Sequence, residues 1–379
     1  MRKILSMPTI RKFVGDLFDE ILHAKQVTSI SHAVLGAVHC VRLSSTRMGH
    51  AMATERGVIP KHAIKQVDRL LGNTKVRWKE AQRAMIRYLV GARKQLVVSL
   101  DWTEYGGDCH SQITLNLVTE HGRATPLLWR TVPDNRLKNN RSAHERALLR
   151  ILKKMLPAEM CVTVLADRGF AGGRFYDYIG RVLGWDYVIR LRENTFVTAN
   201  DGQYFKVRER VPPNGRLAEF TDAMVTAKEC IVRKVVCVKK HGMKESWSLV
   251  TSLSLPKEEI IELYSRRFTC EEHFRDAKDD RFGVGLKETR VSTPVRRDRL
   301  LLIYAISVIL LTLLGKTGET LGYDRRLRAN TVKIRTHSLF RQGREYVKGV
   351  LQSYLTHFLA LFDKLLACHP QCSTTYATL

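Results

Sequence analysis

The sequence contains no apolar run long enough to span a membrane. Its most apolar stretch, LLLIYAISVILLTLL at residues 300–314, has fifteen residues, whereas a spanning helix needs about 20. We therefore predict that this stretch is a helix buried in the core. The first residues, MRKILSMPTIRKFVGDLFDE, also lack a sustained apolar region followed by a cleavage site of small residues, so we do not expect secretion.

Paired cysteines are absent as well. The eight cysteines are scattered without a repeated CxxC pair, which argues against a disulfide framework and against a structural zinc site. The segment CHPQC at residues 368–372 comes nearest to a metal motif, but it lacks a second pair of ligands nearby. We therefore expect a reducing compartment and no structural zinc.

Acidic residues are scarce relative to basic ones. The 379 residues include 63 Lys and Arg against 37 Asp and Glu, which gives a formal charge of +26 and a pI near 10.0. A chain with this excess repels itself unless it acts on a polyanion, and the simplest polyanion is nucleic acid. Because no spanning segment accompanies the basic charge, we predict DNA rather than a membrane as the partner.

The first 90 residues have apolar residues at helical spacing and carry much of the basic charge. They contain 16 Lys and Arg against 6 Asp and Glu, a net charge of +10. Pro60 suits a first helical position, and Gly72 with Asn73 suits a helix end. A helix between them would expose Lys61, Lys65 and Arg69, as in a helix-turn-helix reader of the major groove. A plain solvated basic helix explains the same pattern equally well.

The pattern changes after residue 95. The runs QLVVSLDWTEY, SQITLNLVTEHG and TPLLWRTV predict three antiparallel strands, and strands and helices then alternate through CVTVLADRGF and DYVIRLREN. Short strands return between residues 195 and 252, before a helix that begins near Lys257. We predict an α/β fold in which helices cover a mixed sheet that a β-rich insertion interrupts.

Two acidic residues end predicted strands. Asp101 follows VVSL and Asp167 follows VTVLA, and a carboxylate at the end of a buried strand lies where α/β sheets place ligand chemistry. An Asp in this position is as often a turn former or a helix cap. Glu271 would add a third carboxylate if its helix packs beside the sheet. Three such hard oxygen donors suit two Mg²⁺ ions, and such a pair promotes displacement at phosphorus.

The helix that carries Glu271 also has a polar stripe. In YSRRFTCEEHFRDAK, residues 264–278, the residues Tyr264, Arg267, Glu271 and Lys278 stand at offsets of three, four and seven. They fall within roughly 60° of one another on a regular helix. A solvated helix face would show the same spacing.

The spacing Y-x2-R-x3-E-x6-K resembles the YREK signature of DDE transposases from bacterial insertion sequences. Further similarities are RGF after Asp167, the basic strand DYVIRLREN, and the W-x3-TS context of Trp247; the similar region covers roughly residues 55–345. The resemblance implies an RNase H-like core and a homodimer that pairs transposon ends. It also implies two Mg²⁺ ions, with Mn²⁺ able to substitute, and a bacterial, cytoplasmic, nucleoid-associated protein.

The resemblance further implies roles for individual residues. Asp101, Asp167 and Glu271 would bind the metal ions and act in catalysis. The remaining candidates would contact DNA: Tyr264, Arg267 and Lys278 near the transposon end, Trp247 by stacking on or replacing a flipped base, Arg190 and Arg192 at the backbone, and Lys61, Lys65 and Arg69 on the basic helix. Trp247 could instead be an ordinary core residue, and the two strand arginines could simply face solvent.

These observations predict five regions. They are a helical DNA-binding region at 1–90, the two parts of the core at 91–194 and 256–316, the β-rich insertion at 195–255, and a helical C-terminal region at 317–379. The predicted function is metal-dependent cleavage at terminal inverted repeats, followed by transfer of the 3′-hydroxyl into target DNA. A catalytically inactive, transposase-derived DNA-binding regulator is the alternative. A different RNase H-like nuclease is a third hypothesis, but such enzymes lack the YREK stripe and the long insertion.

Overall fold

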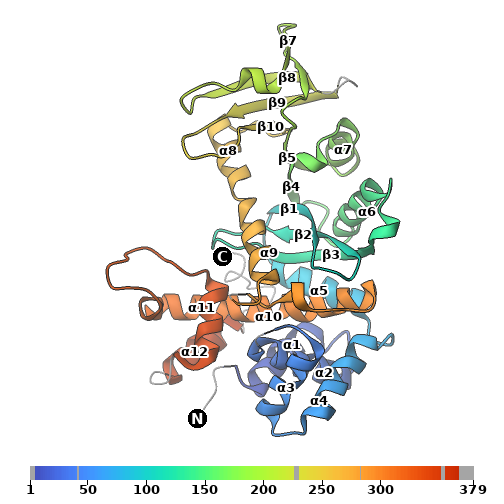
Figure 1. The fold of residues 1–379 in the computed structure, drawn as a ribbon, viewed down its shortest axis with the longest axis vertical. Coiled ribbons are helices and arrows are strands. Elements are labelled where there is room, and N and C mark those ends of the chain that lie inside the picture. Colours follow the sequence, from blue (N-terminus) through green and yellow to red (C-terminus); the bar gives the residue numbers. More distant parts are fainter. Residues whose placement is uncertain (1–4, 41, 226–229, 282, 351–354, 367–379) are drawn as a thin grey trace.

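The structure is a computed structural model that describes residues 5–40, 42–225, 230–281, 283–350 and 355–366. The molecule is elongated (Figure 1). The strands of the predicted insertion lie at one end, the N-terminal helices lie at the other, and the central sheet lies between them (Figure 1). The segment CHPQC and the polar C-terminal tail fall outside the described residues.

One sheet of ten strands runs through the described part of the chain, in the order β3-β2-β1-β4-β5-β10-β9-β8-β6-β7. Strand β1 pairs in parallel with β4, and β4 with β5, while the other neighbours are antiparallel. The first five strands are β1 (Gln95–Glu104), β2 (His110–Leu117), β3 (Thr125–Pro133), β4 (Cys161–Ala166) and β5 (Asp186–Arg190). The predicted meander and mixed sheet are confirmed.

The insertion is β-rich, as predicted, and its strands extend the core sheet. They are β6 (Phe196–Thr198), β7 (Tyr204–Lys206), β8 (Leu217–Val225), β9 (Cys230–Val238) and β10 (Trp247–Thr251). Because β10 pairs with β5, the edge of the core sheet is covered by the insertion. This pairing removes an exposed strand edge that could otherwise pair with another chain.

Both faces of the central sheet are buried, which explains why its strands read as continuous apolar runs. Val164 and Ile189 belong to the large cluster on one face. Their neighbours Leu165 and Val188 pack on the other face with Ile260 of α8 (Lys257–Ser265). Since side chains alternate along a strand, every second residue of β1, β4 and β5 faces α8 and the helix that follows it.

The N-terminal part is helical, as predicted, with α1 (Met7–Phe18), α2 (Ala24–His39), α3 (Ser45–Arg56), α4 (Pro60–Gly72) and α5 (Trp78–Val90). Helices α3 and α4 are joined by a short turn in which Gly57 adopts a left-handed conformation, with φ of 64°. A Cβ on Gly49 would lie 2.5 Å from a side-chain atom of Ile64. The missing side chain therefore lets α3 pack directly against α4, and the pair forms a helix-turn-helix.

The expected single helix over the YREK stripe is wrong in one respect. It is divided into α8 and α9 (Phe268–Lys278), although Arg266 and Arg267 keep right-handed helical dihedrals and the two follow one path (Figure 1). At the junction, backbone N–H groups of Arg267, Thr269 and Cys270 bond to carbonyls three residues earlier. This tighter winding changes the rotation between Tyr264 and the residues that follow it.

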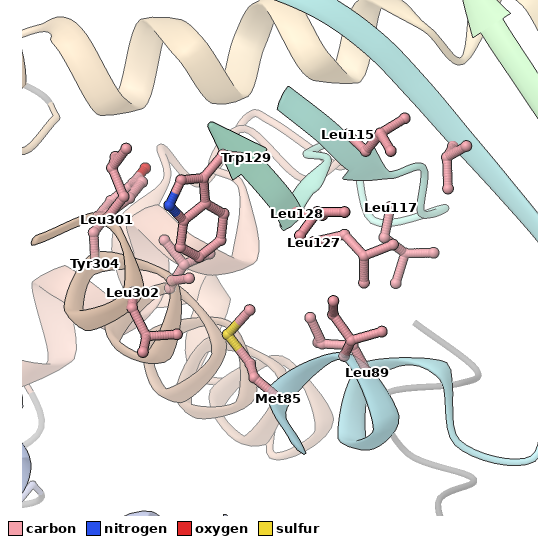
Figure 2. Packing of buried hydrophobic residues seen from close by; sticks show 14 of the residues in the cluster. Met85, Leu89, Leu115, Leu117, Leu127, Leu128, Trp129, Leu301, Leu302 and Tyr304 are labelled. Atoms are coloured by element: carbon pink, nitrogen blue, oxygen red, sulfur yellow. The ribbon is translucent and has the colours of Figure 1, made fainter. Parts of the chain in front are cut away.

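The apolar run at 300–314 lies in α10 (Pro294–Thr320) and is buried, as predicted. Helix α10 is long and apolar enough to cross a membrane by length and composition alone, but 94% of its most apolar window is buried inside the protein. Figure 2 shows Leu301, Leu302 and Tyr304 of α10 packed near Trp129 of β3 and Met85 of α5. Helix α10 therefore joins the sheet to the N-terminal helices.

The remaining helices lie on the two sides of this core. They are α6 (Arg141–Lys153), α7 (Gly173–Asp177) with a following π-helical turn at Tyr178–Val182, α11 (Leu339–Glu345) and α12 (Leu355–Leu366). Helices α6 and α7 cover the sheet, while α11 and α12 pack near α10 (Figure 1). The mixed α/β architecture is the predicted one and is consistent with an RNase H-like core.

Candidate active site

The parallel pairing of β1 with β4 brings Asp101 and Asp167 together. Asp167 directly follows β4, as predicted. The prediction that Asp101 ends a strand is wrong, because β1 continues to pair with β2 as far as Glu104. Leu100 of β1 pairs with Ala166 of β4, so the two acids occupy the next positions on adjacent strands, which lie about 4.8 Å apart. Leu165, two residues before Asp167, faces α8. The period of two therefore aims Asp167 toward the same side. The Asp167 carboxylate also accepts a 2.8 Å hydrogen bond from the backbone N–H of Gly169.

Helix α9 brings Glu271 to this point, and Arg267 lies between the acids. One Arg267 Nη atom is 3.4 Å from Asp101 Oδ2, and the other contacts Glu271 Oε1. The Arg267 side chain is only 8% exposed, against 48% for Glu271. A buried guanidinium thus bridges a strand carboxylate and a helix carboxylate, and it fixes how α9 sits on the sheet.

The electrostatics of Asp101 reflect this convergence. Burial raises the pKa of Asp101 to about 6, against the lowering effect of Arg267, and the charges of Asp167 and Glu271 add to the rise. The backbone N–H of Trp102 donates a 2.8 Å hydrogen bond to Asp101 Oδ1, which favours the ionised form. Asp167 and Glu271 therefore both lie close enough to Asp101 to act on its carboxylate.

This donor set suits a hard divalent cation by its chemistry, because all three groups are carboxylates. A cation already stands between Asp101 and Glu271 in the form of the Arg267 guanidinium. Within the described part of the chain, no group of three or more His, Cys, Asp or Glu side chains is arranged to hold a metal ion. A metal ion bound through Asp101 Oδ2 and Glu271 Oε1 would therefore have to displace Arg267 from these two oxygens.

The aromatic residues next to the acids form a stacked group. Trp247, at the start of β10, stacks on Phe268 with ring centroids 5.5 Å apart and meets Tyr264 edge to face at 5.2 Å. Phe268 is 38% exposed, whereas Tyr264 is only 1% exposed. Tyr264, predicted to contact a phosphate, is thus shielded, and Phe268 covers a face of the predicted stacking residue Trp247.

Lys278, the last residue of α9, extends toward the same acids. Its ammonium lies 5.8 Å from the ring centroids of Tyr105 and Phe274. Burial lowers the pKa of Lys278, while the charges of Asp101 and Glu104 oppose that effect. Lys278 therefore lies near Asp101 and is partly enclosed by aromatic rings.

Arg190 and Arg192 lie in different surroundings. Arg190 ends β5 and donates to Glu245 at 2.7 Å and to the Ser246 carbonyl at 2.9 Å. Arg192 is exposed and lines a cavity of about 610 Å³ that opens beside Asp167. The other lining residues are Arg168, Gly169, Glu193, Asn194 and Arg208. Three guanidinium groups therefore surround a space next to one of the acids.

Lys61, Lys65 and Arg69 are exposed on α4, as predicted. They lie in the helical end of the molecule, separate from the acids (Figure 1). The structure thus groups the candidate residues into two places, one around Asp101 and one on α4.

Sequence reasoning missed several residues that shape the first of these places. Glu145 of α6 is buried and accepts a 2.9 Å hydrogen bond from the indole of Trp102, which anchors the strand next to Asp101. Phe268, Arg168 and Arg208 were also missed. Phe268 and Arg168 could have been predicted, because they are next to Arg267 and Asp167 in the sequence. No feature of the neighbouring sequence marks Arg208 or Glu145.

The central part of the chain is similar to one known protein family. A comparison with curated proteins finds no match to this chain. Among protein families, residues 130–310 match the transposase DDE domain. The matched segment begins in β3, after Asp101, and includes Asp167 and Glu271. This match supports a DDE transposase, an enzyme of the nuclease and transferase type that acts on DNA and belongs to a family that generally uses divalent metal ions.

Proposed function

We propose that this protein cleaves DNA at transposon ends and transfers the freed 3′-hydroxyl into target DNA, as a transposase of the bacterial YREK type. The observation that carries the proposal is that Asp101 lies beside Asp167 on paired strands and shares the Arg267 guanidinium with Glu271. The match of residues 130–310 to the transposase DDE domain supports it independently. The excess of basic residues suits a DNA substrate.

Asp101, Asp167 and Glu271 would hold divalent ions, two Mg²⁺ or Mn²⁺. Such ions, when bound, activate a water or hydroxyl nucleophile and stabilise the attacking and leaving oxygens at phosphorus. The chain itself contributes orientation. Trp102 and Gly169 donate backbone hydrogen bonds that fix the two aspartates, and Arg267 would exchange its carboxylate partners for a DNA phosphate, which a guanidinium binds through two parallel bonds.

The cavity beside Asp167 would take the DNA strand next to the scissile linkage. Arg168, Arg192 and Arg208 line it, and guanidinium groups bind the phosphates of a DNA backbone. Arg168 and Arg190 both contact Glu245, so Glu245 holds part of this basic surface in place. The exposed Phe268, stacked on Trp247, would meet an unstacked base at the same end of the site.

The remaining parts of the proposal concern the whole chain. Of the five predicted regions, residues 1–90 would bind the terminal repeats, and residues 317–379 would contribute to the pairing of two copies. We infer a homodimer that brings two transposon ends together. In this arrangement each core acts on one end, and the helix-turn-helix of α3 and α4 supplies sequence recognition.

The test is cleavage of a duplex that carries the element's own terminal repeat, with Mg²⁺ present, followed by joining to a target plasmid. Wild-type protein should cut at the repeat and produce joined products. Glu271→Gln should lose at least about 10³-fold in cleavage rate, comparable to loss of a principal electrostatic group, while it retains DNA binding. Arg275→Gln, which changes an exposed neighbour on the same helix, should remain active.

Three outcomes separate the hypotheses. Full activity in Glu271→Gln would refute the assignment of the acids. Binding of terminal repeats without any metal-dependent cleavage by wild-type protein would favour the inactive DNA-binding regulator. Cleavage without joined products would favour a different RNase H-like nuclease.

A further inference from the structure

A second basic cavity lies far along the chain from the acids, between α2 and α4. Its volume is about 610 Å³, within the range that accommodates a small organic group rather than a lone ion. The first turns of α2 and the length of α4 form its walls. The lining residues are Lys25, Gln26, Ser29, His62, Lys65, Gln66, Arg69, Leu70, Asn73 and Val76.

The charge of this cavity has one sign. Of its described lining residues none is acidic, whereas Lys25, Lys65 and Arg69 are all basic and exposed. The nearest carboxylate on α4 is that of Asp68, which contacts Arg296 of α10 and so does not neutralise the cavity. Three cations from two helices therefore converge on one space without an acidic partner along its walls.

The floor of the cavity is polar and held in one arrangement. Gln66 Oε1 accepts a 3.0 Å hydrogen bond from Arg56, and Gln66 Nε2 lies 3.0 Å from His32 Nδ1. Burial, together with the charge of Arg56, lowers the pKa of His32 to about 4, so its neutral ring accepts this bond. The Gln66 amide is thus fixed by two partners beneath the basic rim.

We propose that the cavity between α2 and α4 binds the phosphodiester backbone of duplex DNA, with Lys25, Lys65 and Arg69 as its phosphate contacts. This inference rests on the proposed function and specifies how the N-terminal helices hold DNA. Phosphate is the group that two lysines, an arginine and neighbouring amides recognise together. A continuous backbone, rather than a free ion, suits a cavity that follows the side of a helix for about three turns.

The proposal changes the role of two predicted DNA-binding residues. Lys65 and Arg69 face the cavity shared with α2, whereas Lys61 does not line it. Lys65 and Arg69 would therefore position the duplex through its phosphates and would not read base edges. Sequence recognition would fall to other residues near the start of α4, including Lys61.

The test is the salt dependence of DNA binding by the full chain. Fluorescence anisotropy with a labelled mixed-sequence duplex, over about 50–200 mM salt, gives the slope of log affinity against log salt. The double variant Lys65→Ala, Arg69→Ala should reduce that slope by about 2, and Lys25→Ala by about 1. Affinity should fall by the same factor for two unrelated duplex sequences, because phosphates carry no sequence information.

The matched control removes the same charges from another helix. Arg150 and Lys154 stand four residues apart on α6 and at its C-terminal cap, exposed like Lys65 and Arg69. The double variant Arg150→Ala, Lys154→Ala should leave the slope unchanged. A double-mutant cycle between Lys25→Ala and Lys65→Ala should show non-additive losses, because both contact the same stretch of backbone.

Several results would overturn the proposal. One is a salt slope for the double variant Lys65→Ala, Arg69→Ala that equals the slope of the α6 control. Another is a loss of affinity for only one of the two duplex sequences. Calorimetric titration with inorganic phosphate at constant ionic strength provides the third. Saturable binding that the double variant abolishes, with no change in the DNA slope, would show a site for free phosphate. If the wild-type chain binds no duplex at all, the proposed function fails together with this inference.

Discussion

The guanidinium of Arg267 lies 3.4 Å from the carboxylate of Asp101, although the two residues are 166 positions apart in the sequence. The same guanidinium contacts Glu271, one turn further along the helix. Two of the three acids thus share an internal cation. A divalent ion and Arg267 would compete for the same carboxylates, and this competition can be measured without any cleavage assay.

We predict that Arg267→Gln destabilises the metal-free protein and strengthens its response to Mn²⁺. Removal of the guanidinium leaves the negative charges of Asp101 and Glu271 without a cation, which should lower the free energy of unfolding by about 1–3 kcal/mol. The cost is smaller than for a fully buried pair, because the Glu271 carboxylate is half exposed. Bound Mn²⁺ then relieves this repulsion. The increase in Tm on addition of MnCl₂, measured by scanning calorimetry, should be larger in the variant than in the wild type.

Arg275→Gln is the control for this prediction. Arg275 lies on the same helix, is 70% exposed and pairs with Glu272, so its loss should change neither Tm nor the response to Mn²⁺. An equal Mn²⁺ response in the wild type and both variants would show that Arg267 does not compete with the metal ion.

A second prediction concerns Trp247, whose indole stacks on Phe268. If the pair forms a stacking platform for a base, Trp247→Ala should reduce cleavage by more than tenfold and Trp247→Phe by much less, since an aromatic face contributes about 1–3 kcal/mol per stacked base. A 2-aminopurine base placed next to the cleavage site reports unstacking by its fluorescence. The alanine variant should lose that signal while it still binds DNA.

A purely structural role for Trp247 would give a different result. Trp247→Ala would then lower Tm, the 2-aminopurine signal would persist in the folded fraction, and cleavage would fall only in proportion to unfolding. Ile231→Ala in the adjacent strand β9, an exposed position at 66%, is a control for loss of apolar surface away from the aromatic group.

The order of apolar and polar residues within short segments predicted most of the strands and helices of this fold. Alternating and continuous apolar runs located the strands, and Asp101 and Asp167 come to adjacent positions because β1 and β4 pair in parallel. The helix that begins at Lys257 was likewise visible from its sequence. These features depend on side-chain period and turn residues, which a single sequence displays directly. The continuation of β1 past Asp101 was not predicted, because it depends on pairing with β2.

Other features depend on contacts between distant segments or on backbone detail. The three-residue hydrogen bonds at the α8–α9 junction have no signature in the spacing of Tyr264, Arg267 and Glu271, which fits a regular helix equally well. The cover that Phe268 places on Trp247 depends on how α9 crosses β10. Arg208 reaches the cavity beside Asp167 only because the insertion strands extend the core sheet.

A third prediction tests the contact between α10 and α11. A Cβ on Gly315 would lie 1.9 Å from the Leu339 carbonyl oxygen, and one on Gly343 would lie 2.0 Å from that of Leu311. The two glycines thus let the helix backbones touch from both sides. Gly315→Ala should force the helices apart and reduce the free energy of unfolding by at least about 1–3 kcal/mol, measured from urea denaturation.

Gly180 provides the comparison for Gly315. A Cβ there would meet no atom within 4 Å, so Gly180→Ala should leave stability unchanged or raise it slightly. Equal urea midpoints for the two alanine variants would contradict the close packing of α10 on α11.

The last prediction concerns acid stability. His121 is only 5% exposed. Burial lowers its pKa to about 4, and the nearby charges of Arg335, Arg123 and Lys316 act in the same direction. The unfolded chain therefore binds a proton between about pH 6.5 and pH 4 that the folded protein does not, so stability falls as the pH falls through this window.

His121→Phe removes this proton uptake and keeps a ring of similar shape. The decrease in unfolding free energy between pH 7 and about pH 4 should be smaller in the variant than in the wild type, by at most about 3 kcal/mol. Urea denaturation at a series of pH values measures the slope. His241→Phe, at an exposed turn, should leave the slope as in the wild type. If the unfolding free energies of His121→Phe and the wild type fall equally with pH, His121 takes up no extra proton on unfolding. That result would contradict the lowered pKa of His121 in the folded protein.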